Sequence, residues 1–198
     1  MQYDPALNNH GLPHNPFKAI VAPRPIGWIS TISEQGHVNL APYSYFNAFS
    51  DTPPIVGFAS SGYKDSLKNV EATGEFVCNM VSLAFFESMS LTSAPMPYGV
   101  NEMEVVGLKP IESLTVKPPR VDGVPAALEC KVLSIQQLQD IEGRAVKSWL
   151  ILGQVVSIFI DDAALRNGLL DTAVIKPLSR LGYQDYAAVE RVLTLKRP

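Results

Sequence analysis

The sequence predicts a mainly β protein, an antiparallel barrel with short helices at its periphery. Runs rich in β-branched and aromatic residues recur along the chain, and they are long. Most neighbouring runs are separated by a few turn-forming residues, which is typical of hairpins. The regular alternation of strand and helix that marks a parallel sheet is absent. Together these features favour an antiparallel barrel.

The N-terminal segment contributes little to this pattern. Residues 1–16 are rich in Pro, Asn and His, and they predict an extended arm. The segment FKAIVAPRP (17–25) begins apolar and ends at two prolines, so it predicts a short element followed by an extended turn.

The next two runs predict an antiparallel hairpin. IGWISTIS (26–33) carries β-branched residues and a tryptophan, and EQG (34–36) forms the turn. HVNLAPYSYFNAF (37–49) alternates along its length and predicts one continuous second strand. Because proline cannot donate to a strand ladder, we expect Pro42 at a sheet edge or a bulge.

Short helices are predicted between further strands. The helix KDSLKNVEATG (64–74) should turn Leu67 and Val70 inward and end at Gly74. A second helix, SLAFFESMSL (82–91), should be capped by Ser82. The flanking runs PPIVGFAS (53–60) and EFVCNMV (75–81) predict the third and fourth strands.

The C-terminal half predicts a long hairpin after an irregular excursion. Prolines and glycines fill residues 92–124. Two long β-rich runs, 126–140 and 145–160, follow and are joined by IEGR. A helix of one to two turns is expected over 161–168, a turn-like segment over 177–189, and a β-rich tail after it. We expect a single domain over 1–198, with the arm and the excursion as appendages.

The composition limits the partners and the cellular location that we expect for the protein. The net charge of −3 and the pI near 5.6 argue against nucleic acid or an anionic membrane as the main partner, since both favour a basic face. No signal peptide and no apolar run of membrane-spanning length is evident, so we expect a cytoplasmic protein. Cys78 and Cys130 are expected to be buried free thiols.

Most catalytic signatures are missing. No GxGxxG motif follows a strand and no P-loop is present. The segment SGYK (61–64) matches SxxK, but the supporting SDN and KTG elements are absent, so the match is attributed to chance. His10, His14 and His37 are expected in loops, and no metal site is predicted. We assign no catalytic side chain.

One segment, SSGYKDSLKN (60–69), combines hydroxyl groups and a cation at the start of a predicted helix. Unpaired N–H groups and the positive end of the helix dipole make such a terminus suitable for a phosphate. The alternative is that Ser61 or Asp65 caps the helix and Lys64 is solvated. Four aromatic residues nearby are candidates to flank a flat ring: Trp28, Tyr43, Tyr45 and Phe46.

The order of several motifs resembles the flavin reductase-like family of FMN-binding split barrels. The matching pieces are RPIGWIST, NLAPYSYFN, the two prolines before the third strand, KDSLKN, TGEFVCN and, near the C-terminus, PLSRLGYQDYA. Tyr183 stands where members have a second glycine. The resemblance implies a six-stranded antiparallel split barrel, a homodimer, and one FMN in each subunit near the dimer interface.

The resemblance also implies site residues. Ser30, Thr31 and the segment Ala41–Ser44 should lie along the flavin and its ribityl chain, and the end of the third strand and the helix start should hold the phosphate. Arg24 is expected to supply a further charge, and Arg180 and Tyr186 to reach toward the flavin. The expected cofactor-binding set is Arg24, Ser30, Thr31, Ala41, Pro42, Tyr43, Ser44, Ser60, Lys64, Asp65, Ser66, Arg180 and Tyr186.

Three functions remain open from the sequence. The first is an NAD(P)H-dependent flavin oxidoreductase that passes hydride from a nicotinamide to bound FMN and on to an acceptor. The second is a non-catalytic FMN-binding electron carrier. The third is a split barrel without flavin, in which the serines and the lysine only cap a helix.

Overall fold

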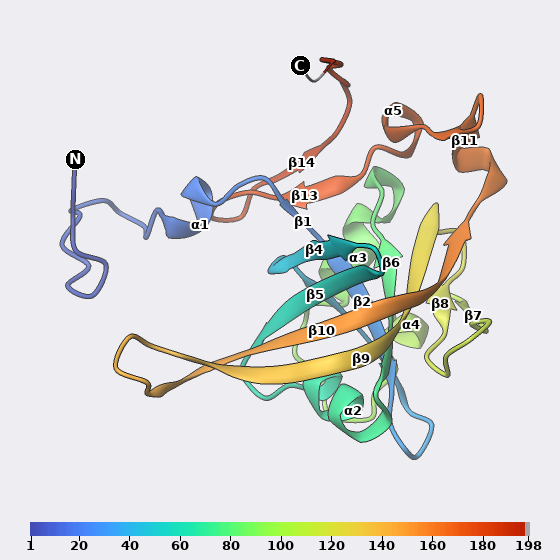
Figure 1. Ribbon diagram of the computed structural model, residues 1–198, viewed down its shortest axis with the longest axis horizontal. Coiled ribbons are helices and arrows are strands. Elements are labelled where there is room, and N and C mark those ends of the chain that lie inside the picture. The colour runs from blue at the N-terminus through green and yellow to red at the C-terminus, as the bar shows by residue number, and fades with distance from the viewer. Residues whose placement is uncertain (197–198) are drawn as a thin grey trace.

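The structure is a computed structural model that describes residues 1–196 of the chain. Its centre is a seven-stranded antiparallel sheet with the strand order β3-β2-β6-β9-β10-β5-β4 (Figure 1). The strands are β2 (Gly27–Ile32), β3 (Val38–Tyr43), β4 (Phe46–Asp51), β5 (Pro54–Ser61), β6 (Glu75–Met80), β9 (Ala126–Gln139) and β10 (Ala145–Ile160). The mainly β antiparallel fold class is confirmed, and so is the hairpin of β2 with β3.

The two edge strands of this sheet are consecutive in the chain. β3 and β4 lie at opposite edges, yet only Ser44 and Tyr45 separate them. The sheet must therefore curl until its edges come together, which produces a barrel that is split between β3 and the β4–β5 pair. At the split, the N–H of Ala59 donates to the carbonyl of Tyr45 at 2.8 Å.

This break corrects the strand predicted over 37–49. Its two halves pair with different neighbours, β2 on one side and β5 on the other, so an unbroken strand is impossible. The division also explains why the main sheet has seven strands where the resemblance implies six. Pro42 lies in the edge strand β3, as predicted. Its partner on the neighbouring strand β2 is Trp28.

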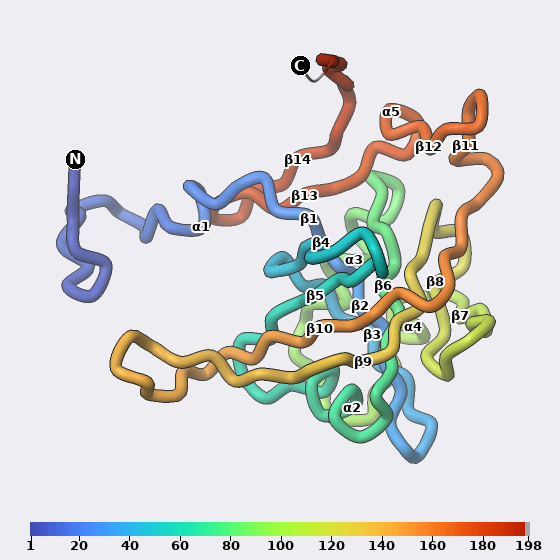
Figure 2. Tube along the Cα trace, viewed as in Figure 1, coloured from blue at the N-terminus to red at the C-terminus, as the bar shows by residue number. Residues whose placement is uncertain are grey.

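With 14 and 16 residues, β9 and β10 are much longer than the other strands of the main sheet, which have six to eight. Figure 2 shows the tip of the β9–β10 hairpin projecting from the barrel on the same side as the first sixteen residues, which contain no helix or strand. The carboxylate of Asp140 accepts hydrogen bonds from the N–H groups of Glu142 and Arg144, at 3.0 and 2.9 Å, and so fixes the turn.

The helices partly follow the predictions. α2 (Asp65–Thr73) buries Leu67 and Val70 and ends at Gly74, whose φ of 70° is left-handed, as predicted. The predicted helix over 82–91 is a 3₁₀ turn, η1 (Leu83–Phe85), followed by α3 (Phe86–Leu91), and the Ser82 side chain does not cap it. The remaining helices are α1 (Phe17–Ile20), α4 (Glu102–Val105) and α5 (Thr172–Ile175).

The predictions after β10 are partly wrong. Only one 3₁₀ turn, η2 (Asp162–Ala164), forms in 161–168, because the following residues pair in a small hairpin of β11 (Leu165–Arg166) with β12 (Leu169–Leu170). Another short pair, β7 (Pro110–Ile111) with β8 (Arg120–Val121), lies in the excursion.

The segment predicted as turn-like, 177–189, also forms strands. It contains β13 (Leu178–Arg180) and β14 (Tyr186–Ala188), which join β1 (Arg24–Pro25) in a separate three-stranded sheet. No strand forms in 189–196, so the predicted β-rich tail is wrong for these residues. The partner of β13 comes from the other end of the chain, and local composition carries no information about it.

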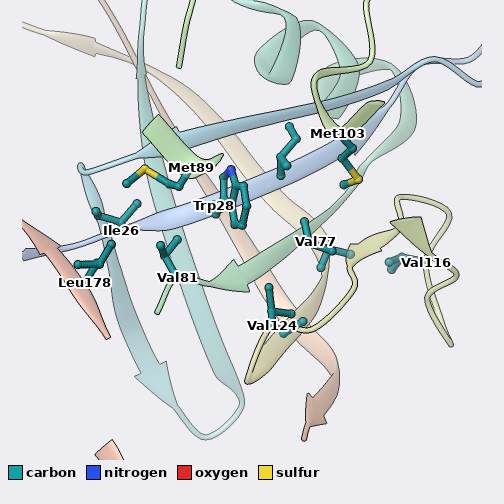
Figure 3. Close-up of a cluster of buried hydrophobic side chains, with 12 residues drawn as sticks. Ile26, Trp28, Val77, Val81, Met89, Met103, Val116, Val124 and Leu178 are labelled. Carbon is teal, nitrogen blue, oxygen red and sulfur yellow. The ribbon is translucent and has the colours of Figure 1, made fainter. Parts of the chain in front are cut away.

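Two buried clusters hold the sheet in place. Successive residues of β2 point to opposite faces, so Trp28 enters one cluster and Ile29 the other. Figure 3 shows Trp28 projecting into the first cluster, where its Nε1 also donates to Thr92 Oγ1 at 2.9 Å. The second cluster contains Phe58 and Phe76, whose rings meet edge to face.

Among residues 1–196, no helix has the length and apolar character needed to cross a membrane.

A close approach in this second cluster predicts the effect of Gly153→Ala. A methyl group at Gly153 would lie 2.5 Å from Cε1 of Phe76 and 3.2 Å from the Cβ of Cys130. Such overpacking should lower the free energy of unfolding by about 1–3 kcal/mol, measured by denaturant unfolding.

The smaller side chain of Phe76→Leu should relieve that clash. The double variant is then expected to lose less stability than the sum of the two single losses, by more than about 0.5 kcal/mol. Strictly additive losses would contradict the proposed contact.

Candidate active site

A cavity of about 570 Å³ lies at the split of the barrel, within the range of roughly 300–1,000 Å³ that is typical of small-molecule sites. It is bounded by β3, the end of β5, the start of α2 and the first part of the excursion. The lining residues are Lys18, Asn39, Ala41, Pro42, Tyr43, Ser44, Tyr45, Ala59, Ser61, Tyr63, Lys64, Asp65, Ser66, Thr92, Ser93, Ala94, Pro95, Met96 and Glu102.

The first turn of α2 opens into this cavity without a side-chain cap. Lys64 occupies the N-cap position with an extended backbone, and its side chain makes no capping hydrogen bond. The alternative that Ser61 or Asp65 caps the helix is therefore wrong. The first N–H groups of a helix have no partner within the helix, and the helix dipole adds positive potential there. Together with the Lys64 ammonium group, they form a site suited to a phosphate.

Asn39 and Ser66 link β3 to the helix start. The Asn39 amide donates to Ser66 Oγ at 2.8 Å, and both side chains are buried. Because Ser66 accepts this bond, its own O–H remains available to donate.

Tyr43, also in β3, has a buried hydroxyl group with no hydrogen-bond partner within residues 1–196. Its ring centroid lies 4.8 Å from that of Phe58. Burial raises the pKa of Tyr43 above its ordinary value, although the nearby hydroxyl groups of Ser66 and Ser60 lower it in part. The phenol is therefore neutral at pH 7 and does not act as a base.

The excursion supplies a second wall. Its start is fixed by Thr92, which accepts from Trp28 and donates to the carbonyl of Met89 at 2.8 Å. Further on, the Tyr98 hydroxyl donates to Asn69 of α2 at 3.1 Å, and the Lys68 ammonium lies 3.6 Å from the centre of the Tyr98 ring. The segment between these attachments lines the cavity.

The comparisons with known proteins agree with this geometry. The model of the flavin reductase like domain matches residues 21–178. The chain belongs to the flavin reductase-like family. A curated relative in Aquifex aeolicus is 39% identical over 173 residues, covering 84% of this chain and 85% of that protein. YwrF of Bacillus subtilis is 31% identical over 184 residues, covering 90% and 89%.

Solved structures of this family superimpose closely. Nitrilotriacetate monooxygenase component B from Bacillus cereus has a TM-score of 0.87 and 27% identity, and the match covers 98% of each chain. The 2-nitrobenzoate 2-nitroreductase NbaA of Pseudomonas fluorescens has a TM-score of 0.80 and 29% identity, covering 92% of this chain and 88% of that one. A split-barrel protein from Shewanella frigidimarina, 22% identical with a TM-score of 0.86 over the whole of both chains, shows the same fold.

Seven of the residues predicted for a flavin reductase-like site meet at the cavity. They are Ala41, Pro42, Tyr43, Ser44, Lys64, Asp65 and Ser66. Ser60 lies at the same end of β5 but is fully buried, and its hydroxyl donates to the carbonyl of Gly62 at 2.9 Å.

Ser30 and Thr31 do not line the cavity. Ser30 Oγ donates to the carbonyl of Pro119 at 2.5 Å, and Thr31 Oγ1 accepts from Asn69 Nδ2 at 3.1 Å. Both hydroxyl groups are fully buried and already used inside the protein.

Arg24, Arg180 and Tyr186 lie in the separate three-stranded sheet. The buried guanidinium of Arg24 donates to the carbonyls of Lys18, Val21 and Leu181, the last at 2.8 Å, so it joins α1 to the C-terminal hairpin. Arg180 lies 4.2 Å above the ring of Tyr186.

The turn of this hairpin places Tyr183 at a φ of 54°. This left-handed conformation is the one that a glycine adopts without strain. The backbone shape therefore matches the glycine that the resemblance implies at this position.

Two charged residues of the cavity, Lys18 and Glu102, were missed by the sequence predictions. Lys18 lies in α1 and Glu102 in α4. Neither belongs to a motif of the resemblance, and only the fold brings both to the cavity.

The unpartnered hydroxyl of Tyr43 predicts that Tyr43→Phe does not destabilise the ligand-free protein. Removing a buried polar group that makes no hydrogen bond is neutral or stabilising. Tyr98→Phe is the matched control, because it removes a hydroxyl that does make a bond, and it should cost about 0.5–1.5 kcal/mol. Denaturant unfolding measures both, and a loss above about 1 kcal/mol for Tyr43→Phe would show that its hydroxyl has a partner.

Proposed function

We propose that this protein binds FMN in the cavity at the split of the barrel and transfers hydride from NAD(P)H to the flavin and on to an acceptor. The main support is the uncapped first turn of α2, which opens into the cavity of a flavin reductase-like chain.

The proposed phosphate contacts come from one short segment. The N–H groups of the first turn of α2, the Lys64 ammonium and the free O–H of Ser66 all donate, as a phosphate requires. We assign Asp65 to ordering this segment and not to contacting the phosphate, because like charges repel.

The residues beyond the helix start fit the rest of a flavin. Small and apolar residues from β3 and from the excursion line the same cavity, among them Ala41, Pro42, Ala94 and Pro95. Such walls suit a flat ring, and the exposed backbone of an edge strand offers N–H and C=O groups for its polar rim. The serine side chains that line the cavity suit the hydroxyl groups of a ribityl chain.

A bound flavin supplies the hydride-accepting chemistry. The chain then only has to bind and orient the reactants and limit the access of water. Among residues 1–196, no histidine or cysteine lines the cavity, and the neutral phenol of Tyr43 does not take up a proton at pH 7. The proposal therefore assigns cofactor-binding residues and no acid–base residue.

The solved relatives support redox chemistry at such a site. Their names describe a monooxygenase component and a nitroreductase, which are both oxidoreductase functions. We propose NAD(P)H as the donor because the membership in the flavin reductase-like family favours it, and the acceptor stays open.

We also propose a homodimer. Val156, Ile158 and Ile160 alternate along β10 and are exposed, so one face of this strand presents an apolar stripe. Leu133 of the paired strand β9 is exposed as well. A second copy of the chain would remove this apolar surface from water.

The proposed phosphate site predicts the effect of replacing Lys64 and Ser66 together by alanine. FMN binding should weaken by about a hundredfold or more, because hydrogen bonds to charged groups contribute about 1.5–3 kcal/mol each. Riboflavin, which lacks the phosphate, should bind nearly as well as it binds the wild-type protein. Quenching of flavin fluorescence measures both affinities.

Lys109→Ala is the control, since Lys109 is an exposed lysine that does not line the cavity. It should leave the ratio of the two affinities unchanged. An equal loss of FMN and riboflavin binding in the double variant would place the phosphate elsewhere.

Hydride transfer predicts steady-state oxidation of NADH or NADPH by the FMN-loaded protein with an electron acceptor present. The absorbance of the reduced nicotinamide should fall, and the Lys64→Ala, Ser66→Ala double variant should lose this activity at low FMN concentration. A protein that binds FMN but oxidises neither nucleotide is an electron carrier. A protein that binds no flavin is neither a flavin oxidoreductase nor a flavin-based electron carrier.

A further inference from the structure

Glu102 is a buried carboxylate of the cavity without a cationic partner. Its residue is only 6% exposed, and no salt bridge to it occurs within residues 1–196. α4 carries it against β3, where it lines the same cavity as Asp65 and Ser66. These two residues lie in the first turn of α2, which together with Lys64 forms the phosphate site proposed above, the α2 mouth. A buried charge without a counter-ion is costly, so such a group favours its neutral form.

The two oxygens of this carboxyl group are not equivalent. Oε2 accepts the backbone N–H of Leu40 at 2.8 Å, which commits it as an acceptor. Oε1 accepts no hydrogen bond from another residue within residues 1–196, and it is not fully enclosed there. Since the residue lines the cavity and Oε2 is committed to Leu40, Oε1 is the oxygen that can carry a proton.

The charges around Glu102 are nearly balanced in the empty cavity. Lys18 of α1 and Lys64 at the N-cap of α2 are cationic, and Asp65 of α2 is anionic. The tyrosines that line the cavity, Tyr43 and Tyr45 near the end of β3 and Tyr63 before α2, are neutral near pH 7. A phosphate at the helix start would add up to two negative charges on the side of Asp65.

We propose that Glu102 is protonated at Oε1 whenever a phosphate monoester occupies the α2 mouth, so that binding of the phosphorylated ligand takes up one proton from solvent. The neutral carboxylic acid no longer repels the phosphate, and its O–H faces the cavity. Glu102 thus makes the preference for a phosphorylated over an unphosphorylated flavin depend on pH. This inference rests on the proposed function.

The electrostatics of the ligand-free site agree in direction. Burial raises the pKa of the Glu102 carboxyl above its ordinary value, and the charge of Asp65 raises it further, while the N–H groups of Leu40 and of Glu102 itself lower it. A nearby phosphate has the same sign as Asp65 and acts in the same direction. Because binding then takes up a proton, affinity for the phosphorylated ligand must fall as pH rises.

The test compares FMN with riboflavin on the full-length, flavin-free protein by titration calorimetry between about pH 5 and pH 8. Glu102→Gln mimics the neutral acid at all pH values. Glu104→Gln is the matched control, because Glu104 lies in the same helix, is exposed and does not line the cavity.

The expected result concerns the ratio of the FMN dissociation constants of wild type and Glu102→Gln. This ratio should be near one at low pH and should rise by up to about tenfold per pH unit above the titration of Glu102. The same ratio for riboflavin should stay flat, and Glu104→Gln should behave as wild type. The titration of the FMN phosphate itself cancels in the ratio, since both proteins bind the same ligand.

A second measurement uses the wild-type protein alone. Near pH 8, where the phosphate of free FMN is a dianion, binding enthalpies in buffers of different ionisation enthalpy should show net proton uptake for FMN and none for riboflavin. This result does not depend on whether Glu102→Gln folds.

Three results would overturn the inference while leaving the proposed function intact. They are FMN binding without proton uptake, an identical pH dependence in wild type and Glu102→Gln, and an equal loss of both flavins in that variant at every pH. The last would mean that ionised Glu102 accepts a bond from a part of the ligand shared by both flavins. Failure of the wild-type protein to bind either flavin would overturn the proposed function and this inference together.

Discussion

The short passage from β3 to β4 is the constraint on which the rest of the structure depends. With only Ser44 and Tyr45 between them, the two strands cannot lie far apart, yet they form opposite edges of the sheet. The sheet must curl until its edges meet. Within residues 1–196, β3 pairs only with β2 and β4 only with β5, so the barrel stays split between these two edges. The cavity lies at this split, which is called the seam below. The barrel and its candidate site therefore have one cause.

The elements around the split give the cavity both polar and apolar lining residues. The uncapped start of α2 contributes N–H groups and Lys64. The excursion closes the cavity, and its attachments at Thr92, Tyr98 and Glu102 reach three different elements, β2, α2 and β3. A cavity of this kind suits a ligand with an anionic end and a flat apolar end.

Local sequence patterns predicted most of the framework. Strong alternation and short turns located β2, β5, β6 and the β9–β10 hairpin, and the periodicity of Leu67 and Val70 with Gly74 located α2. Local patterns failed where long-range pairing decides the outcome. The strand over 37–49 breaks because its halves have different partners, and β13 forms because β1 arrives from the N-terminal region.

In the candidate site, too, local motifs predicted some residues, and long-range packing decided the others. Motif residues from the segment 41–66 meet at the cavity, because β3 and the start of α2 are adjacent across the seam. Ser30 is hydrogen-bonded to Pro119 and Thr31 to Asn69, and both of these partners lie far away in the sequence. Glu102 belongs to no motif, and only the packing of α4 on β3 brings it to the cavity.

The visible absorption spectrum of the purified protein, before and after incubation with excess FMN and desalting, tests the central claim most directly. Oxidised flavin absorbs at roughly 370 and 450 nm, a property that belongs to the cofactor itself. The account predicts that these bands are retained in at least the FMN-treated sample, and that Lys64→Ala with Ser66→Ala loses them. Desalted protein without flavin bands in either sample would contradict it.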